Sequence, residues 1–83
     1  MKLNCYCVEN CRSGISTGLW TYRTDAQAIY EISHMISNSD GGQDLANDRL
    51  FCVGTFDNET KELLVIPARE LSLDLEIKPT NEV

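Results

Sequence analysis

Hydrophobic and polar side chains alternate over residues 3–9, which is the period of a half-buried β-strand. Residues 15–23 are rich in β-branched and aromatic side chains and predict a second strand, in which Gly18 indicates a bulge or a close approach of the backbone. Turn-forming residues fill positions 10–14. We therefore predict that the two strands form a hairpin.

A helix is expected from Thr24 to Ile36. Thr24 and Gln27 have the spacing of a capping box, in which side chains satisfy free backbone N–H groups at the helix start. Apolar residues at helical spacing then define one face: Ala28, Ile29, Ile32, Met35 and Ile36. Turn formers at 37–42 end the helix, and residues 41–49 are expected to form an exposed loop.

The second half of the chain predicts three further strands. Residues 50–56 are apolar on both faces, as in a central strand, and residues 62–66 follow after a short loop built around a type I turn. Pro67 is expected to end that strand because it has no backbone N–H. Strict alternation over 71–78 predicts a last strand with one buried face.

These elements predict a small α+β fold, an antiparallel β-sheet with one helix packed on one face, in the order β-β-α-β-β-β. We expect one domain over residues 1–78 and a flexible tail over 79–83. One helix cannot cover both faces of such a sheet, so the other face is either solvated or buried by a second subunit. A chain of 83 residues has a thin core, and we therefore expect a homodimer.

Composition places the chain among globular proteins. Apolar residues make up 42% and charged residues 24%, which is too apolar for a disordered chain. No apolar run approaches the roughly 20 residues that cross a bilayer, so no membrane association is expected. The N-terminus becomes polar too soon for a signal peptide, which favours an intracellular protein with reduced thiols.

The cysteines allow a disulfide, a metal site or free thiols. Cys5 and Cys7 are two residues apart, and a bond between them would distort a strand. A zinc site would use Cys5, Cys7, Cys11 and either Cys52 or His34. Structural zinc sites have two close-spaced ligand pairs, whereas this chain has one cluster and one distant cysteine. We therefore expect free thiols that pack as small apolar groups, and neither a metal nor another cofactor.

Charge is divided unevenly along the chain. Residues 1–24 carry a net charge of +2 and residues 25–83 a net charge of −8, for a total of −6. The basic part also contains aromatic side chains, which suit stacking on single-stranded DNA at ~1–3 kcal/mol per base. The candidate nucleic-acid-binding residues are Tyr6, Arg12, Trp20, Tyr22 and Arg23. The alternative is that these aromatic residues belong to the core or to a dimer interface.

The acidic part suggests a different kind of partner. Carboxylates on neighbouring strand edges could form a patch that binds a basic host protein. The candidate residues are Asp57, Glu59, Glu62, Glu70, Asp74 and Glu76. The alternative is that these charges serve only solubility.

Nothing in the chain favours an enzyme. His34 is the one histidine, and no orienting group or oxyanion motif accompanies it in the sequence. Phosphate-binding, dinucleotide-binding and zinc-protease motifs are absent from the sequence. We expect His34 at the rim of the helix and no catalytic residue.

The segment from Leu50 to Leu63 resembles the small non-structural protein of gokushoviruses, which are single-stranded DNA phages of the Microviridae. That family pairs a strand of the pattern Leu, aromatic, any, Val or Ile, Gly, any, aromatic, Asp with an acidic turn. Lys61 replaces the commoner turn glycine. The resemblance implies a phage accessory protein of the host cytoplasm, absent from the virion and without enzymatic activity, that acts in genome replication or packaging. We expect it to act by weak binding of single-stranded DNA or, alternatively, as an acidic protein-binding module.

Overall fold

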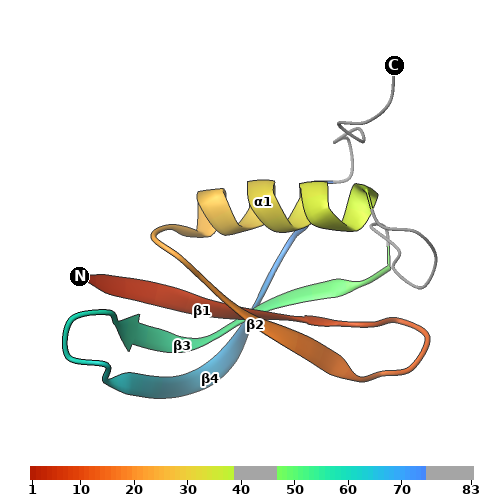
Figure 1. Cartoon of the computed structure of the whole chain (residues 1–83). Helices are drawn as coiled ribbons and strands as arrows, with labels where there is room; N and C mark the ends of the chain where they lie inside the picture. The colour runs from red at the N-terminus through yellow and green to blue at the C-terminus, as the bar shows by residue number, and fades with distance from the viewer. Residues whose placement is uncertain (39–46, 75–83) are drawn as a thin grey trace.

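The computed structural model describes residues 1–38 and 47–74, and these form a four-stranded antiparallel sheet with one helix (Figure 1). The predicted α+β class is confirmed. The elements in chain order are β1 (Lys2–Glu9), β2 (Ser16–Tyr22), α1 (Asp25–Ser37), β3 (Arg49–Asp57) and β4 (Leu63–Leu71).

The strands lie in the order β2-β1-β3-β4, so β1 and β3 are central and β2 and β4 are the edges. Two hairpins, β1–β2 and β3–β4, are joined through α1, which lies over one face of the sheet (Figure 1). The central position predicted for the strand over 50–56 is confirmed. The fold therefore has two layers, and its core lies between α1 and the two inner strands.

The first hairpin contains the bulge that Gly18 predicts. Tyr6 pairs with Trp20 and Val8 pairs with Thr17, so β2 has one extra residue opposite β1. Gly18 has a φ of 76°, which disfavours residues with a Cβ. The indole ring of Trp20 lies directly against this glycine, and a Cβ at Gly18 would be 2.1 Å from that ring. The predicted bulge is confirmed, and the group that lies close to Gly18 is the Trp20 side chain.

Pro67 does not end its strand, and this prediction is wrong. β4 continues through Pro67 to Leu71. Its pairing with β3 shifts at this point. Val65 pairs with Gly54 and Arg69 pairs with Cys52, so β4 has extra residues between these two pairs. The bulge and the edge position of β4 together explain why a residue without an N–H is tolerated there.

The prediction of a last strand over residues 71–78 is also wrong for residues 72–74, which the structure describes. Leu71 is the final residue of β4, and residues 72–74 belong to no strand. Instead, the backbone N–H of Asp74 donates a hydrogen bond of 2.9 Å to the Ser33 hydroxyl oxygen on α1. Residues 75–78 of that prediction, the tail over 79–83 and the first six positions of the expected 41–49 loop lie outside the described residues.

The helix begins as its capping box predicts. The N–H of Gln27 donates to the Thr24 hydroxyl oxygen at 3.1 Å. The Gln27 amide oxygen accepts from the N–H of Arg23 at 3.3 Å, one residue earlier than the expected Thr24 N–H. Two N–H groups at the helix entrance are thereby satisfied.

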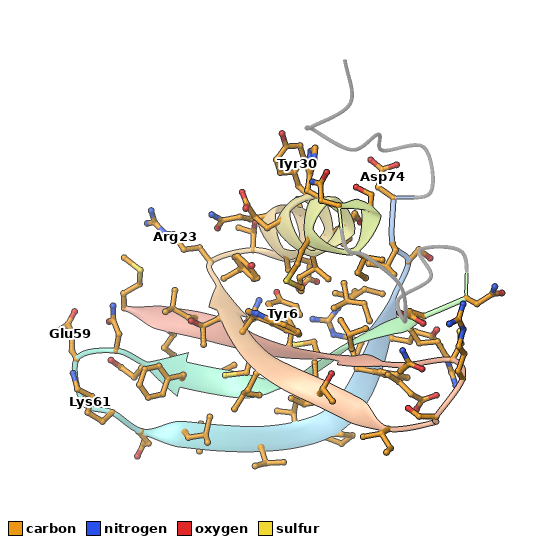
Figure 2. All side chains as sticks on the ribbon, turned by 45° about the vertical axis from the view of Figure 1, so that its right-hand side comes forward. Tyr6, Arg23, Tyr30, Glu59, Lys61 and Asp74 are labelled. Carbon is orange, nitrogen blue, oxygen red and sulfur yellow. The ribbon has the colours of Figure 1, made fainter. Side chains whose placement is uncertain are left out.

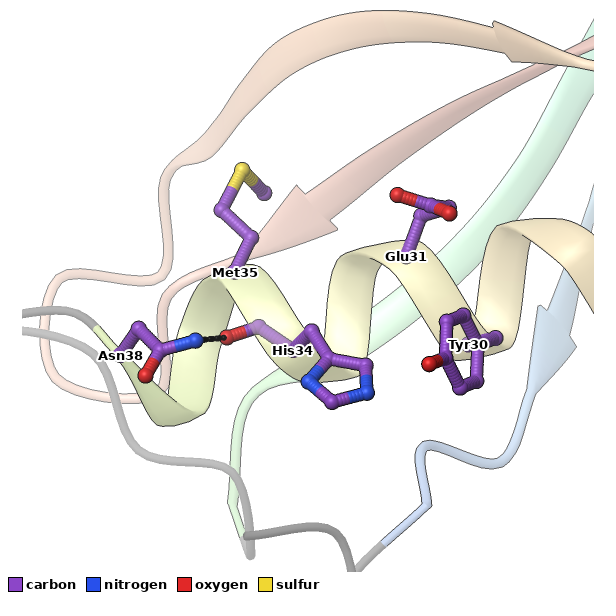
Figure 3. Close-up of a pocket in the computed structure, with 5 residues that line it drawn as sticks. All are labelled: Tyr30, Glu31, His34, Met35 and Asn38. Atoms are coloured by element: carbon purple, nitrogen blue, oxygen red, sulfur yellow. Dashed lines mark hydrogen bonds between the residues drawn. The ribbon is translucent and has the colours of Figure 1, made fainter. Parts of the chain in front are cut away.

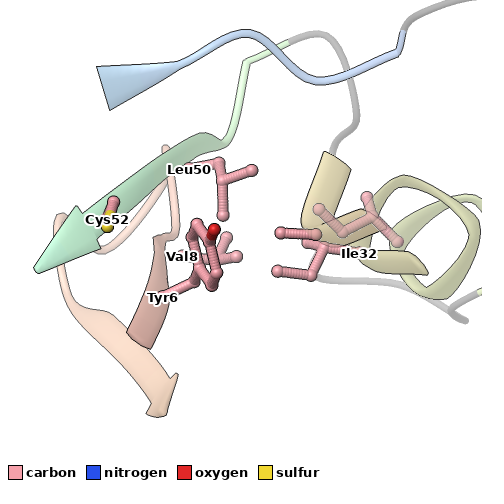
Figure 4. Packing of buried hydrophobic residues seen from close by; sticks show 7 residues of the cluster. Tyr6, Val8, Ile32, Leu50 and Cys52 are labelled. Atoms are coloured by element: carbon pink, nitrogen blue, oxygen red, sulfur yellow. The ribbon is translucent and has the colours of Figure 1, made fainter. Parts of the chain in front are cut away.

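The core is formed by residues of α1, β1 and β3 (Figure 4). Ala28, Ile32 and Ile36 are buried as predicted, Ile29 is half-buried and Met35 is exposed. The buried cluster comprises Tyr6, Val8, Ala28, Ile32, Ile36, Leu50 and Cys52.

Candidate functional site

Tyr6 lies in the core and not on the surface that was expected to bind DNA. Its side chain is fully buried between the sheet and α1 (Figures 2 and 4). Its hydroxyl donates a hydrogen bond of 2.7 Å to Asp25 Oδ1. No face of this ring is open to a base, so the expectation that Tyr6 contributes to a stacking platform is wrong.

The two aromatic residues of β2 lie beside Tyr6. Trp20 and Tyr22 share a face of the strand, as the sequence indicates, but that face is turned toward the helix and packs against the core. The ring centroids of Tyr6 and Tyr22 are 6.0 Å apart with a tilt of 49°. The aromatic residues are therefore brought together as a packing cluster, which favours the alternative interpretation of this group.

The two arginines of the predicted DNA site are far apart. Both are exposed, Arg12 in the turn before β2 and Arg23 in the turn after it. The seven residues of β2 that separate them span about 20 Å at the usual rise per residue. The expected combination of stacked rings edged by arginines is not assembled.

A polar network surrounds the Tyr6 hydroxyl. Asp25 accepts hydrogen bonds from two nitrogens of Arg69, at 2.8 Å and 3.3 Å. Those hydrogen bonds, followed by the one from Tyr6, hold the pKa of Asp25 below its usual value. Burial and the bond to Asp25 raise the pKa of Tyr6. The network joins β1, the first turn of α1 and β4, and no sequence pattern indicates it because Asp25 and Arg69 are 44 residues apart.

The expected acidic patch is divided between different parts of the molecule. Asp57 and Glu59 lie in the β3–β4 turn, where Glu59 accepts a hydrogen bond of 2.9 Å from the N-terminal amine. Hydrogen bonds from the backbone N–H groups of Glu59 and Thr60 lower the pKa of Asp57. These carboxylates are partly engaged in forming the turn.

The other carboxylates of that set lie elsewhere. Glu70, near the opposite end of β4, forms two hydrogen bonds with Arg49, at 3.0 Å and 2.8 Å. Asp74 lies beside α1, far from Glu59 (Figure 2). Glu62 is exposed next to the β3–β4 turn, and Glu76 lies outside the described residues. The prediction of one continuous acidic patch along strand edges is wrong for the described residues.

The sheet face turned away from α1 carries apolar side chains from all four strands. The pairing register places on this face the odd-numbered residues of β1 and their partners on β3 and β4. We call the following residues the open face: Leu3, Cys7, Leu19, Phe51, Phe56, Leu63 and Val65.

Three residues of the open face are largely exposed. Leu19 is 62% exposed, Leu63 52% and Val65 84%, and the remaining four are half-buried. Within the described residues no helix or strand covers this side of the sheet, as Figure 1 shows. The residues of this face cannot be identified from alternation alone, because the bulges at Gly18 in β2 and at Val53 in β3 decide which side chains point there.

Charged residues border one end of the open face. Arg49 binds Glu70 as described, lies 3.8 Å from a Glu9 carboxylate oxygen and stacks over the ring of Phe51 at 5.1 Å from its centroid. The positive charge is thereby shared between two carboxylates and an aromatic ring. This end has one positive and two negative side chains, a net charge of −1, and lies beside the apolar side chains of the face.

A shallow hollow lies on the outer side of α1 (Figure 3). It is lined by Tyr30, Glu31, His34, Met35 and Asn38. The rings of Tyr30 and His34 meet edge to face, with centroids 4.4 Å apart. Among the described residues, no hydrogen-bond partner reaches His34 Nδ1. The lining residues include no serine or cysteine that His34 could activate.

The four cysteines are free thiols, of which Cys5 and Cys52 are buried, Cys7 is half-buried and Cys11 is exposed. Burial raises the pKa values of Cys5 and Cys7. In the described part of the chain, no three His, Cys, Asp or Glu side chains are grouped in a way that could hold a metal ion.

No helix among residues 1–38 and 47–74 has the length and apolar character needed to cross a membrane. Comparison with known proteins gives no matching family model, no matching curated protein and no matching solved structure.

Proposed function

We propose that this protein is a small, non-enzymatic binding protein that attaches to another protein chain through its open face. The observation that carries this proposal is the exposure of Leu19, Leu63 and Val65 on a face that also holds four half-buried apolar side chains. Single exposed apolar residues are common on soluble proteins, whereas a continuous apolar group bordered by polar residues is typical of an interaction site.

The arrangement of the open face supports a protein partner over a small molecule or DNA. The face is formed by the four strands, and the hollow lined by Tyr30 and His34 lies elsewhere, on the outer side of α1. Its charged border, Arg49 with Glu70 and Glu9, has a net charge of −1 and so does not favour phosphates. A flat apolar centre with a charged rim is the usual composition of a protein–protein interface.

Binding of single-stranded DNA has weaker support. The aromatic rings expected to stack on bases pack against the core, and Arg12 and Arg23 are separated by the length of β2. The phage origin, the role in replication or packaging and the location in the host cytoplasm stay predictions that rest on the resemblance, which covers roughly residues 1–66 and has its motif at 50–63.

Site-specific photocrosslinking tests the proposed function. A photoreactive phenylalanine analogue at Val65 is expected to form covalent adducts with another protein chain, either a second copy in purified solution or a different protein in a lysate of the native host. The same analogue at Tyr30, which is exposed on the outer side of α1, is the matched control. Adducts that form equally at both positions, or at neither, would contradict binding through the open face.

A further inference from the structure

We propose that the partner of the open face is a second copy of this chain, so that two sheets pack face to face with both helices on the outside. This inference rests on the proposed function and specifies its partner. The area of the face, the charges around it and the arrangement of sheet and helix in each chain support the proposal.

The two sides of the sheet differ in what covers them. α1 packs on one side of the sheet over the core residues of the two inner strands, while the other side has apolar residues from every strand and no second layer among the described residues. Sheets with two apolar faces are stable when both are covered, and two sheets that pack face to face form a sandwich. A two-fold axis through the open face lets each copy supply the missing layer of the other, because an isologous interface needs only one self-complementary patch.

The open face is large enough for a weak dimer. The exposed parts of Leu19, Leu63 and Val65, with the smaller exposed parts of the half-buried residues, give a face on the order of 500 Å² per copy. Two such faces bury on the order of 1,000 Å² in total, which lies at the lower end of the range for biological interfaces. The expected assembly is therefore a reversible dimer that depends on concentration.

The distribution of charge around the open face favours a second copy over a basic partner. The open face itself carries apolar side chains, and the charges at its border are mutually paired through Arg49. The acidic surplus lies away from its centre, for example at Asp57 and Glu59 in the β3–β4 turn. Salt screens repulsion between two copies that each carry a charge of −6, and so it strengthens the dimer. The same salt would weaken attraction to a basic protein.

Sedimentation equilibrium of the full chain, from micromolar to millimolar concentration at low and high salt, tests this proposal. The weight-average mass of the wild type is expected to rise toward twice the chain mass with concentration, and further at high salt. Val65→Glu is expected to stay monomeric. Tyr30→Glu adds the same charge to the outer side of α1 and is expected to dimerise as the wild type does.

Leu19→Thr provides a second variant in case Val65→Glu impairs folding, which circular dichroism would detect. It is expected to shift the midpoint of dimerisation to higher concentration. A wild type that stays monomeric throughout, or a folded Val65→Glu that dimerises like the wild type, overturns the proposal. If the wild type is monomeric but the crosslinker at Val65 captures a different protein, the second copy is rejected while the proposed binding function stands.

Discussion

The hydroxyl group of Tyr6 is the polar end of a side chain that is otherwise packed among hydrocarbon groups. Its one carboxylate partner, Asp25, is in turn held by Arg69. Burial of a tyrosine is favourable when the ring gains apolar contacts and the hydroxyl keeps a hydrogen bond. Tyr6 satisfies both conditions, which explains why an aromatic residue on an alternating strand is part of the core in this protein.

Removal of the Tyr6 hydroxyl tests this interpretation. Tyr6→Phe is expected to lower the free energy of unfolding by about 1–2 kcal/mol, because it removes a hydrogen bond to a charged group while keeping the ring. Urea denaturation followed by circular dichroism measures the loss. Tyr30→Phe, at an exposed position, is the matched control and should leave stability unchanged. Equal effects of the two substitutions would show that the bond to Asp25 does not stabilise the fold.

Lys61 occupies a backbone conformation that favours glycine. Its φ is 68°, and its N–H donates to the Asp57 carbonyl oxygen at 2.7 Å in the β3–β4 turn. Residues with a Cβ pay roughly 1–2 kcal/mol in this region. Lys61→Gly is therefore expected to raise the free energy of unfolding by about 0.5–1 kcal/mol, after allowance for the greater freedom of glycine in the unfolded chain.

Lys61→Ala is the control for that substitution. It removes the amine, which donates to the Asn58 carbonyl oxygen, but keeps the Cβ and hence the strain. Thermal denaturation of the three proteins separates the two effects. A glycine variant no more stable than the alanine variant would argue against strain at this turn.

The β1–β2 hairpin depends on a contact between a glycine and an aromatic ring. Gly18 has a positive φ, and the indole ring of Trp20 lies against it and packs on the core. A Cβ at position 18 would therefore add steric conflict to backbone strain. The sequence indicated that Gly18 was special, but not that Trp20 was the reason, because the direction of the indole depends on the strand twist and on the helix above it.

Gly18→Ala is expected to destabilise the protein by about 2–3 kcal/mol and to change the fluorescence of Trp20, because the ring must move. Gly14→Ala is the matched control. Gly14 also has a positive φ, of 70°, but no atom lies within 4 Å of the position its Cβ would take. That variant should lose only about 1 kcal/mol and leave the fluorescence unchanged. Similar losses and unchanged emission in both variants would contradict a role for the indole contact.

In β4, the position of the strand at the sheet edge changes the effect that a proline has on it. The sequence of Leu63–Ile66 was correctly predicted as a strand, but its end was not, because Pro67 is excluded only from central strands. The bulge at Pro67 changes the register of β4 and brings Arg69 next to Cys52 on β3. This places Arg69 within reach of Asp25 on the helix.

The molecule as a whole is held together by contacts between elements that are distant in sequence. The network of Tyr6, Asp25 and Arg69 connects both hairpins to the helix. Its contribution depends on pH because Asp25 must be ionised. The pKa of Asp25 is lowered in the folded protein, so this contribution is present above the ordinary pKa of a carboxyl group and is lost as the pH falls below it.

Asp25→Asn is therefore expected to be less stable than the wild type at neutral pH, and the difference should shrink as the pH falls below about 4. Urea denaturation of both proteins across this range measures the difference. Glu62→Gln is the control, since its side chain is exposed and lies outside the network. A difference between Asp25→Asn and the wild type that is independent of pH would show that the charge of Asp25 is not involved.

The sequence by itself determined the local elements of this protein. The helix start at Thr24, the bulge at Gly18 and the two hairpins follow from backbone preferences that act over a few residues. The tertiary structure decided which face of each strand became the core. Tyr6 and Leu3 stand on opposite sides of β1, and only the position of α1 buries one and leaves the other on the open face. Alternation identifies two faces, but the face that is covered depends on contacts with elements elsewhere in the chain.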